Sequence, residues 1–206
     1  MRTFPETQVA RHVKSQVERY VDGIDISGQC VDFWEIFKHE EKDMTTLLSL
    51  DLGTTTGWAV YRCEQCYLNS AQEQIISGVM SFACDRYSGG GMRFLRFRKW
   101  LDEIKALNNG LDEVYFEEVR RHVGTDASHV YGGFMAHLTA WCEQEGIPYE
   151  GVPVGTIKKF MTGNGSASKD MMMEAIRQKG HVPQDHNEAD ALALLYWRLF
   201  GERKTS

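Results

Sequence analysis

The stretch from Leu47 to Val60 constrains the fold of this chain more than any other part of the sequence. Its first half is an almost continuous apolar run, which is typical of a strand covered on both faces. Asp51 interrupts that run, and an ionised carboxylate is costly there unless it is paired or binds a metal. Gly53 and Gly57 free the backbone to turn and let a ligand approach closely. The stretch therefore indicates a buried strand, a glycine turn and a returning strand.

Asp51 has two interpretations at this point. Its side chain could cap the backbone of the glycine turn, which is a structural role. It could instead lie at the carboxyl end of a central strand, where open α/β sheets bind their ligands. Motifs later in the chain decide between the two.

Composition limits the classes of protein that this chain can belong to. Its 206 residues suit one domain with an appendage, and the net charge of −6 excludes a global basic field, so any DNA contact must come from a local patch. The odd count of five cysteines and the lack of a signal peptide favour reduced thiols and a cytoplasmic location. No apolar run reaches the roughly 18 residues of a membrane span, so we expect no membrane association.

Residues 1–44 are predicted to form a helical N-terminal extension. Val9, Val13 and Val17 recur at helical spacing, and a second short helix is expected from Val31 to Lys42. One interpretation is a helical pair packed on the main domain, and the alternative is an arm that binds a protein partner or forms a dimer.

The domain from residue 45 to 206 is predicted to be α/β. Strands are expected at 45–52, 57–63, 75–83, 113–119 and 147–154. Helices are expected at 92–107 and 127–145 (capped by Asp126), in a short basic segment from Thr156, from about Lys169, and after Asp185. Short loops join the first three strands, which suggests an antiparallel meander. The later strand–helix–strand run implies a parallel unit.

Each of three local features has two interpretations that the sequence leaves open. Gly132 and Gly133 would permit close packing on the sheet or on a second subunit. Cys63 and Cys66 are either half of a zinc site or part of an ordinary hairpin loop. The first half of helix 92–107 carries cations that are either solvated or in contact with a phosphate backbone: Arg93, Arg96, Arg98 and Lys99.

Several carboxylates occur within apolar strands and helices, where the hydrophobic pattern gives no simple structural reason for them. Glu117 and Glu118 alternate faces of one strand, so only one of them can point at a given site. Asp185 and Glu188 fit a capping box, whereas Asp190 lies one turn into an apolar helix. Clustered carboxylates raise one another's pKa unless cations neutralise them, and such oxygen ligands suit Mg²⁺ or Mn²⁺. Two such ions can hydrolyse a phosphodiester.

From Leu47 onward the chain resembles the RuvC-type Holliday junction resolvases, often carried by phages and prophages, within the ribonuclease H-like superfamily. The shared motifs are Leu-Asp-Leu-Gly at 50–53, Phe-Glu-Glu-Val at 116–119, a lysine–glycine loop at 158–169 and Asp-Ala-Leu-Ala at 190–193. The resemblance implies a mixed five-stranded sheet flanked by helices. It further implies a homodimer that cuts two opposed strands of branched DNA and leaves a 5′-phosphate and a 3′-hydroxyl, in a bacterial cell or a phage-infected host.

The resemblance also assigns roles to individual residues. Catalytic roles are implied for Asp51, Glu117, Asp190 and Lys169. Two Mg²⁺ ions, for which Mn²⁺ would substitute, are expected on Asp51, Glu117, Asn187 and Asp190. DNA contacts are expected from Arg120, Arg121, Lys158, Lys159 and Lys169.

The chain departs from the family at two positions. Asn187 stands at the fourth acidic position, where an amide oxygen can bind Mg²⁺ without charge, and His186 is the other neighbour of Asp190. Arg120 stands where well-known members carry an aromatic wedge.

Two other functions are compatible with parts of the sequence. Asp-Leu-Gly-Thr-Thr at 51–55 also resembles the phosphate loop of sugar kinases and actin-like ATPases, but those need two such domains and a second phosphate loop. A branched-DNA-binding protein with weak catalysis is the third possibility, supported by Asn187.

Overall fold

The computed structural model describes residues 44–64, 72–119 and 124–201, and within them a five-stranded sheet in the order β3-β2-β1-β4-β5. The strands are β1 (Met44–Asp51), β2 (Thr55–Glu64), β3 (Gln72–Ser81), β4 (Glu113–Glu118) and β5 (Tyr149–Pro153). Strands β1, β2 and β3 pair antiparallel, and β1, β4 and β5 pair parallel. The predicted meander, parallel unit and mixed sheet are therefore confirmed.

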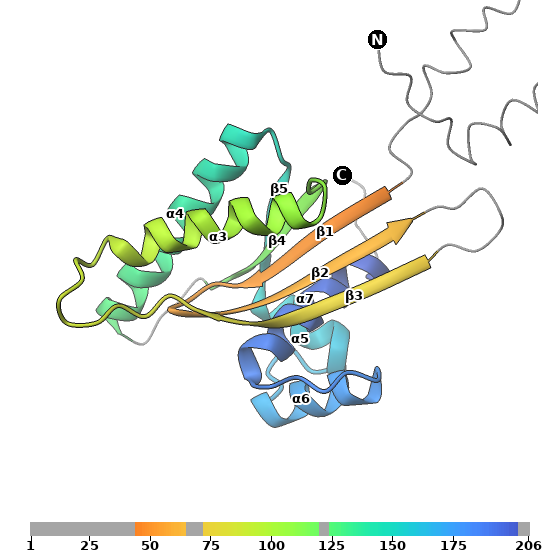
Figure 1. Cartoon of the computed structure of the whole chain (residues 1–206). Coiled ribbons are helices and arrows are strands. Elements are labelled where there is room, and N and C mark those ends of the chain that lie inside the picture. The colour runs from red at the N-terminus through yellow and green to blue at the C-terminus, as the bar shows by residue number, and fades with distance from the viewer. Residues whose placement is uncertain (1–43, 65–71, 120–123, 202–206) are drawn as a thin grey trace, which may run out of the picture. The chain divides into compact units, whose positions relative to one another are not determined.

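Helices cover both faces of this sheet, as Figure 1 shows. Helices α3 (Met92–Leu107) and α4 (Thr125–Glu145) lie on one face. The other face carries α5 (Val154–Thr162), α6 (Lys169–Gln178) and α7 (His186–Phe200). The predicted capping role of Asp126 is wrong, because α4 begins earlier, with Gly124 as its N-cap residue and Asp126 inside the first turn.

Strand β1 separates two hydrophobic cores because its side chains alternate between the faces. Leu48 and Leu50 are fully buried in the core under α3 and α4. Leu47 is buried in the second core, with residues of α7. Asp51 continues the series of Leu47 and Ser49, so its side chain points to the α7 face.

Gly57 fixes how closely α7 approaches the sheet. It lies inside β2, paired with Asp51, rather than in the predicted turn. A Cβ built at Gly57 would lie 1.8 Å from the carbonyl oxygen of Asn187. The close approach that glycine permits is therefore made by the first turn of α7 and not by a ligand, which corrects the sequence-based interpretation.

The two glycines of α4 differ in their surroundings. A Cβ at Gly133 would lie 2.3 Å from the ring of Phe94 on α3, whereas a Cβ at Gly132 would meet nothing within 4 Å. The predicted packing role therefore belongs to Gly133, and it operates between α4 and α3 rather than against the sheet.

Some sequence-based predictions lie outside the described residues. These are the helical extension, up to residue 43, and the loop with Cys66, for which half of a zinc site is one interpretation. Among the described residues, no helix combines the length and apolar character that crossing a membrane requires.

We predict that Gly57→Ala destabilises the protein by about 1–3 kcal/mol, because its methyl group must displace the α7 backbone. Thermal unfolding measures the loss. Gly89→Ala is the matched control, since a Cβ there enters open space. An unchanged melting temperature for Gly57→Ala would contradict the close contact.

Candidate active site

One pocket collects the carboxylates that the sequence singled out. It has a volume of about 530 Å³ and lies at the carboxyl ends of β1 and β4. Its polar wall consists of Asp51, Glu117, Lys158, Lys169, Asn187 and Asp190. Residues far apart in the sequence therefore meet in one place.

The sheet register brings the first two carboxylates together. Asp51 is the last residue of β1, and Leu50 pairs with Phe116 in the parallel ladder to β4. The next position along β4 is Glu117, so the two acids are neighbours on the face that α7 covers. Glu118 alternates to the other face and does not line the pocket.

Helix α7 contributes Asp190, and a buried hydroxyl on β1 fixes where that helix lies. Ser49 Oγ donates a hydrogen bond to the carbonyl of Ala191 at 2.8 Å, and the carbonyl of Ala59 is a more distant alternative acceptor at 3.2 Å. Ser49 shares the face of Asp51, so this contact joins the strand of one acid to the helix of the other. Sequence reasoning missed Ser49, although a serine two residues before Asp51 in an apolar run was a visible signal.

Tyr131 on α4 fixes the end of β4 from the opposite side. Its hydroxyl donates to the carbonyl oxygen of Glu117 at 2.9 Å and accepts a hydrogen bond from the amide of Val119 at 3.2 Å. These bonds satisfy backbone groups where the ladder of β4 ends. Nothing in the sequence distinguished Tyr131 from an ordinary core aromatic.

Burial raises the pKa of the three acidic groups, and for two of them repulsion by neighbouring acids adds to it. Burial, followed by the charges of Asp51 and Asp190, raises the pKa of Glu117 well above its ordinary value. Burial and then the charge of Asp190 also raise the pKa of Asp51, while a hydrogen bond with Glu117 opposes that rise. Burial also raises the pKa of Asp190, against the attraction of Lys158 and Lys169.

The two pocket lysines have different environments. Lys158 Nζ donates to the carbonyl of Ala167 at 2.8 Å, which ties α5 to the loop before α6. Lys169 is the exposed first residue of α6, and its charge lowers the pKa of both Asp51 and Asp190. Lys159 is exposed and does not line the pocket. The predicted DNA contacts Arg120 and Arg121 lie outside the described residues.

Comparison with solved protein structures identifies the fold of this chain. No family model matches the sequence, and a search of curated proteins found no match. Thermus thermophilus RuvC matches with a TM-score of 0.60 and 19% identity, over 75% of this chain and 96% of that one. T. thermophilus RuvC in complex with Holliday junction substrate matches with a TM-score of 0.59 and 18% identity, over 76% and 97%. The chain has the RuvC fold. The fold predicted from the four motifs is confirmed.

The carboxylate pocket of this RuvC fold has the donor chemistry that a divalent cation requires. Among the described residues, no group of three or more His, Cys, Asp and Glu side chains is arranged to hold a metal ion. Glu117 is hydrogen-bonded to Asp51, and the Asn187 amide is hydrogen-bonded to Asp185 at 2.9 Å. Asp51, Glu117 and Asp190 are the carboxylates that would hold such a cation, and its charge would offset the repulsion between them.

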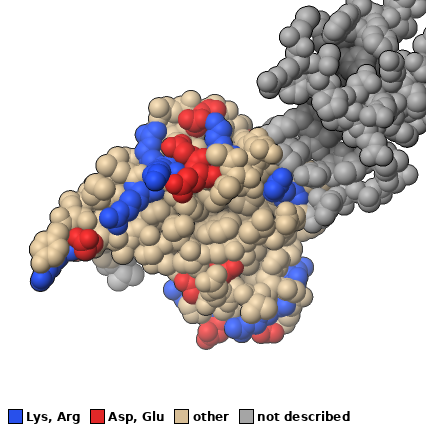
Figure 2. Space-filling model, viewed as in Figure 1, with Lys and Arg blue, Asp and Glu red and all other residues tan. Residues whose placement is uncertain are grey.

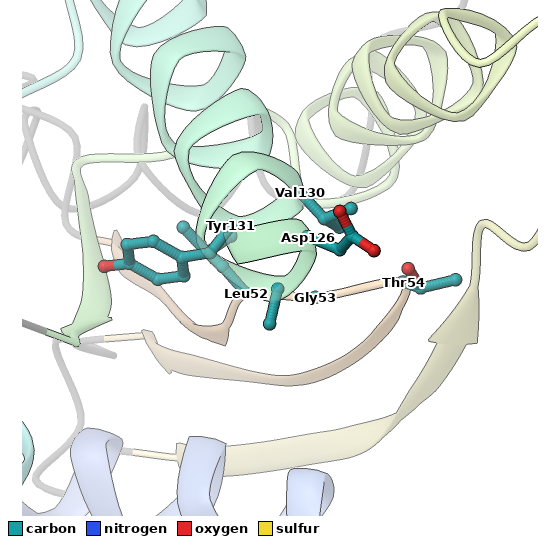
Figure 3. Close-up of a pocket in the computed structure, with 7 residues that line it drawn as sticks. Leu52, Gly53, Thr54, Asp126, Val130 and Tyr131 are labelled. Atoms are coloured by element: carbon teal, nitrogen blue, oxygen red, sulfur yellow. The ribbon is translucent and has the colours of Figure 1, made fainter. Parts of the chain in front are cut away.

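A second pocket adjoins the first, shown in Figure 3. It has a volume of about 370 Å³, shares Leu52 and Tyr131 with the carboxylate pocket, and extends along Thr54 and the first turn of α4 to Asp126. The carboxyl end of β1 therefore contributes to two adjacent hollows, of which the first holds the carboxylates and lysines.

The surface around α3 carries mixed charge rather than a positive field. Figure 2 shows basic and acidic side chains next to one another on this face. Lys99 pairs with Glu103 at 3.6 Å, and Lys105 pairs with Glu145. Several cations near α3 therefore have partners within the protein.

We predict that Glu117→Gln raises the melting temperature of the metal-free protein. The folded state binds the Glu117 proton more tightly than the unfolded state, so its free energy of unfolding falls as pH rises above the ordinary value of 4.5. The gain from Gln should be small near about pH 5 and grow towards about pH 8, by about 2–4 °C for each kcal/mol relieved.

Glu174→Gln serves as the control for this measurement, because it removes the same charge from the exposed surface of α6. A gain for Glu117→Gln that does not exceed the control at any pH would contradict the proposed cost of burying Glu117.

Proposed function

We propose that this protein is a metal-dependent, structure-specific endonuclease that cleaves Holliday junctions or other branched DNA. The observation that carries the proposal is the convergence of Asp51, Glu117 and Asp190 in one pocket, with Lys158 and Lys169 beside them. The RuvC fold supports it, since one matching structure is a RuvC in complex with Holliday junction substrate.

The cation ligands would be Asp51, Glu117, Asp190 and the amide oxygen of Asn187. When bound, two Mg²⁺ or Mn²⁺ ions would neutralise the phosphate and activate water for attack on phosphorus. Asp51 and Glu117 hold their positions because each directly follows the last pair of the parallel ladder between β1 and β4, Leu50 with Phe116. The Ser49 bond to α7 holds Asp190 beside them.

Lys169 would place a protein positive charge next to the scissile phosphate. It extends from the first turn of α6 into the pocket, where it offsets negative charge on the acids and on the substrate. Hydrolysis forms a new bond from water oxygen to phosphorus and breaks the bond to the 3′ oxygen, which takes up a proton. The products would carry a 5′-phosphate and a 3′-hydroxyl.

The proposal includes a homodimer. A four-way junction has two-fold symmetry, so paired cuts in opposed strands call for two sites related by a two-fold axis. Helix α4 is the candidate interface, because Gly132 leaves open space on its surface whereas Gly133 is occupied by α3.

We predict that Asp51→Asn, Glu117→Gln and Asp190→Asn each lower the cleavage rate by at least about 10³-fold, since each removes several kcal/mol of charge stabilisation. The assay uses four-way junctions labelled on one strand at a time, in Mg²⁺, with linear duplex as the substrate control. Junction binding should persist in all three variants, because cations elsewhere hold the DNA backbone.

Glu118→Gln, on the opposite face of β4, is the matched control and should cleave like the wild type. Paired nicks in opposed strands would support the dimer. Junction binding by the wild type without cleavage would instead favour the branched-DNA-binding alternative.

We predict that Lys169→Gln weakens junction binding and lowers its salt slope by about one, because one phosphate contact is lost. The cleavage rate should fall on the order of tenfold to a hundredfold. Lys105→Gln, a lysine paired with Glu145 on the other face of the sheet, is the control for binding across a salt series. Equal effects at the two positions would argue against a pocket role for Lys169.

A further inference from the structure

Asp185 makes two contacts where a helix cap needs only one. It is the N-cap residue of α7, and its Oδ1 accepts a hydrogen bond from the Glu188 amide at 3.0 Å. Its Oδ2 accepts a second hydrogen bond, from Asn187 Nδ2, at 2.9 Å. The first bond is an ordinary cap that serine or threonine can also provide, so the second bond is the informative one.

The second bond sets the orientation of the Asn187 amide. A carboxylate only accepts hydrogen bonds, so the atom facing Asp185 must be the amide nitrogen. The oxygen is consequently the end of the amide that remains for a pocket ligand. Asn187 lines the pocket together with Asp51 and Asp190, and an amide oxygen is a suitable ligand for Mg²⁺.

The charge of Asp185 also reaches the pocket, although its side chain is not part of the wall. It raises the pKa of Asp51 and of Asp190, as a smaller contribution than burial. The neutral Asn187 thus has an anionic neighbour whose charge acts on the same groups.

The glutamate of the same helix turn does not share this role. Glu188 is buried and turned to β3, where it accepts hydrogen bonds from Ser77 Oγ at 2.7 Å and from the Gln184 amide at 2.8 Å. Of the two acids around the start of α7, Asp185 is therefore the one connected to the pocket.

We propose that Asp185 is a positioning residue for divalent-cation binding: it turns the Asn187 amide oxygen towards the pocket and adds a negative charge behind it. This role rests on the proposed function, because it assumes that the pocket binds a divalent cation. Hydrogen bonds behind a metal ligand typically change metal affinity by about 10–100-fold.

The test measures cation binding by the full chain without DNA. Mn²⁺ alone, and separately Mg²⁺ alone, is titrated while the rise in melting temperature is followed. Asp185→Ser keeps a cap acceptor for α7 but removes the second acceptor and the charge. We expect its midpoint cation concentration to rise by about tenfold or more, with little change in the metal-free melting temperature.

Three further variants separate positioning from charge and from folding. Glu174→Gln removes one exposed acid from α6 and should shift the midpoint by less than about twofold. Asp185→Asn, which keeps the cap and the side-chain volume, replaces Asp185→Ser if that variant does not fold. The double variant Asp185→Ser with Asn187→Asp places a carboxylate on the pocket wall and should restore the wild-type midpoint.

A double-mutant cycle with Asn187→Ala tests whether Asp185 acts through Asn187. Positioning predicts that adding Asp185→Ser to Asn187→Ala has much less effect than Asp185→Ser alone. If the midpoint shifts of Asp185→Ser and Asn187→Ala were fully additive in the double variant, Asp185 would not act through Asn187. If the Asp185→Ser midpoint equalled that of Glu174→Gln, Asp185 would have neither a positioning nor a charge role. If wild-type protein bound neither cation, both this role and the proposed function would fail; a normal wild-type response with an unchanged Asp185→Ser midpoint would overturn this role alone.

Discussion

The burial of three carboxylates beside the carboxyl ends of β1 and β4 is the constraint on which the rest of this structure depends. Burial raises the pKa of all three groups, and the charges of the neighbouring acids raise the pKa of Asp51 and Glu117 further. A protein tolerates such a cost only if the surrounding packing prevents the groups from moving apart. Bringing these acids together therefore costs stability in the folded protein, and a bound cation would offset that cost under the proposed function.

Helix α7 is held in place by contacts that leave it little freedom. The glycine at position 57 lets the Asn187 carbonyl approach β2, and the Ser49 hydroxyl binds the Ala191 carbonyl from β1. Both contacts involve the backbone of α7, so they fix the helix itself and not only a side chain. On the other face, Tyr131 fixes the end of β4 through backbone groups in the same way.

Cations are supplied locally, in keeping with a chain whose net charge is −6. Lys158 and Lys169 come from helices that the Gly-rich segment 163–165 connects, and Ser168 caps the second of these helices. On α3, Lys99 and Lys105 have acidic partners. Positive charge is therefore available next to the acids, where the proposed substrate phosphate would need it.

The sequence by itself determined the order of strands and helices and singled out Asp51 and Asp190, because apolar periodicity and a carboxylate without a structural reason are local properties. The resemblance to the RuvC-type resolvases selected Glu117 over Glu118. The sequence also indicated that only one of Glu117 and Glu118 faces the site, since strand side chains alternate. Only the tertiary structure decided which contacts place those acids. Ser49 bonds to the α7 backbone, Gly57 packs against Asn187, and Tyr131 bonds to the Glu117 carbonyl, all between residues that are not neighbours in the sequence. The hydrogen bond from the Asn187 amide to Asp185 depends on side-chain orientation at the start of α7. No local sequence pattern encodes these contacts.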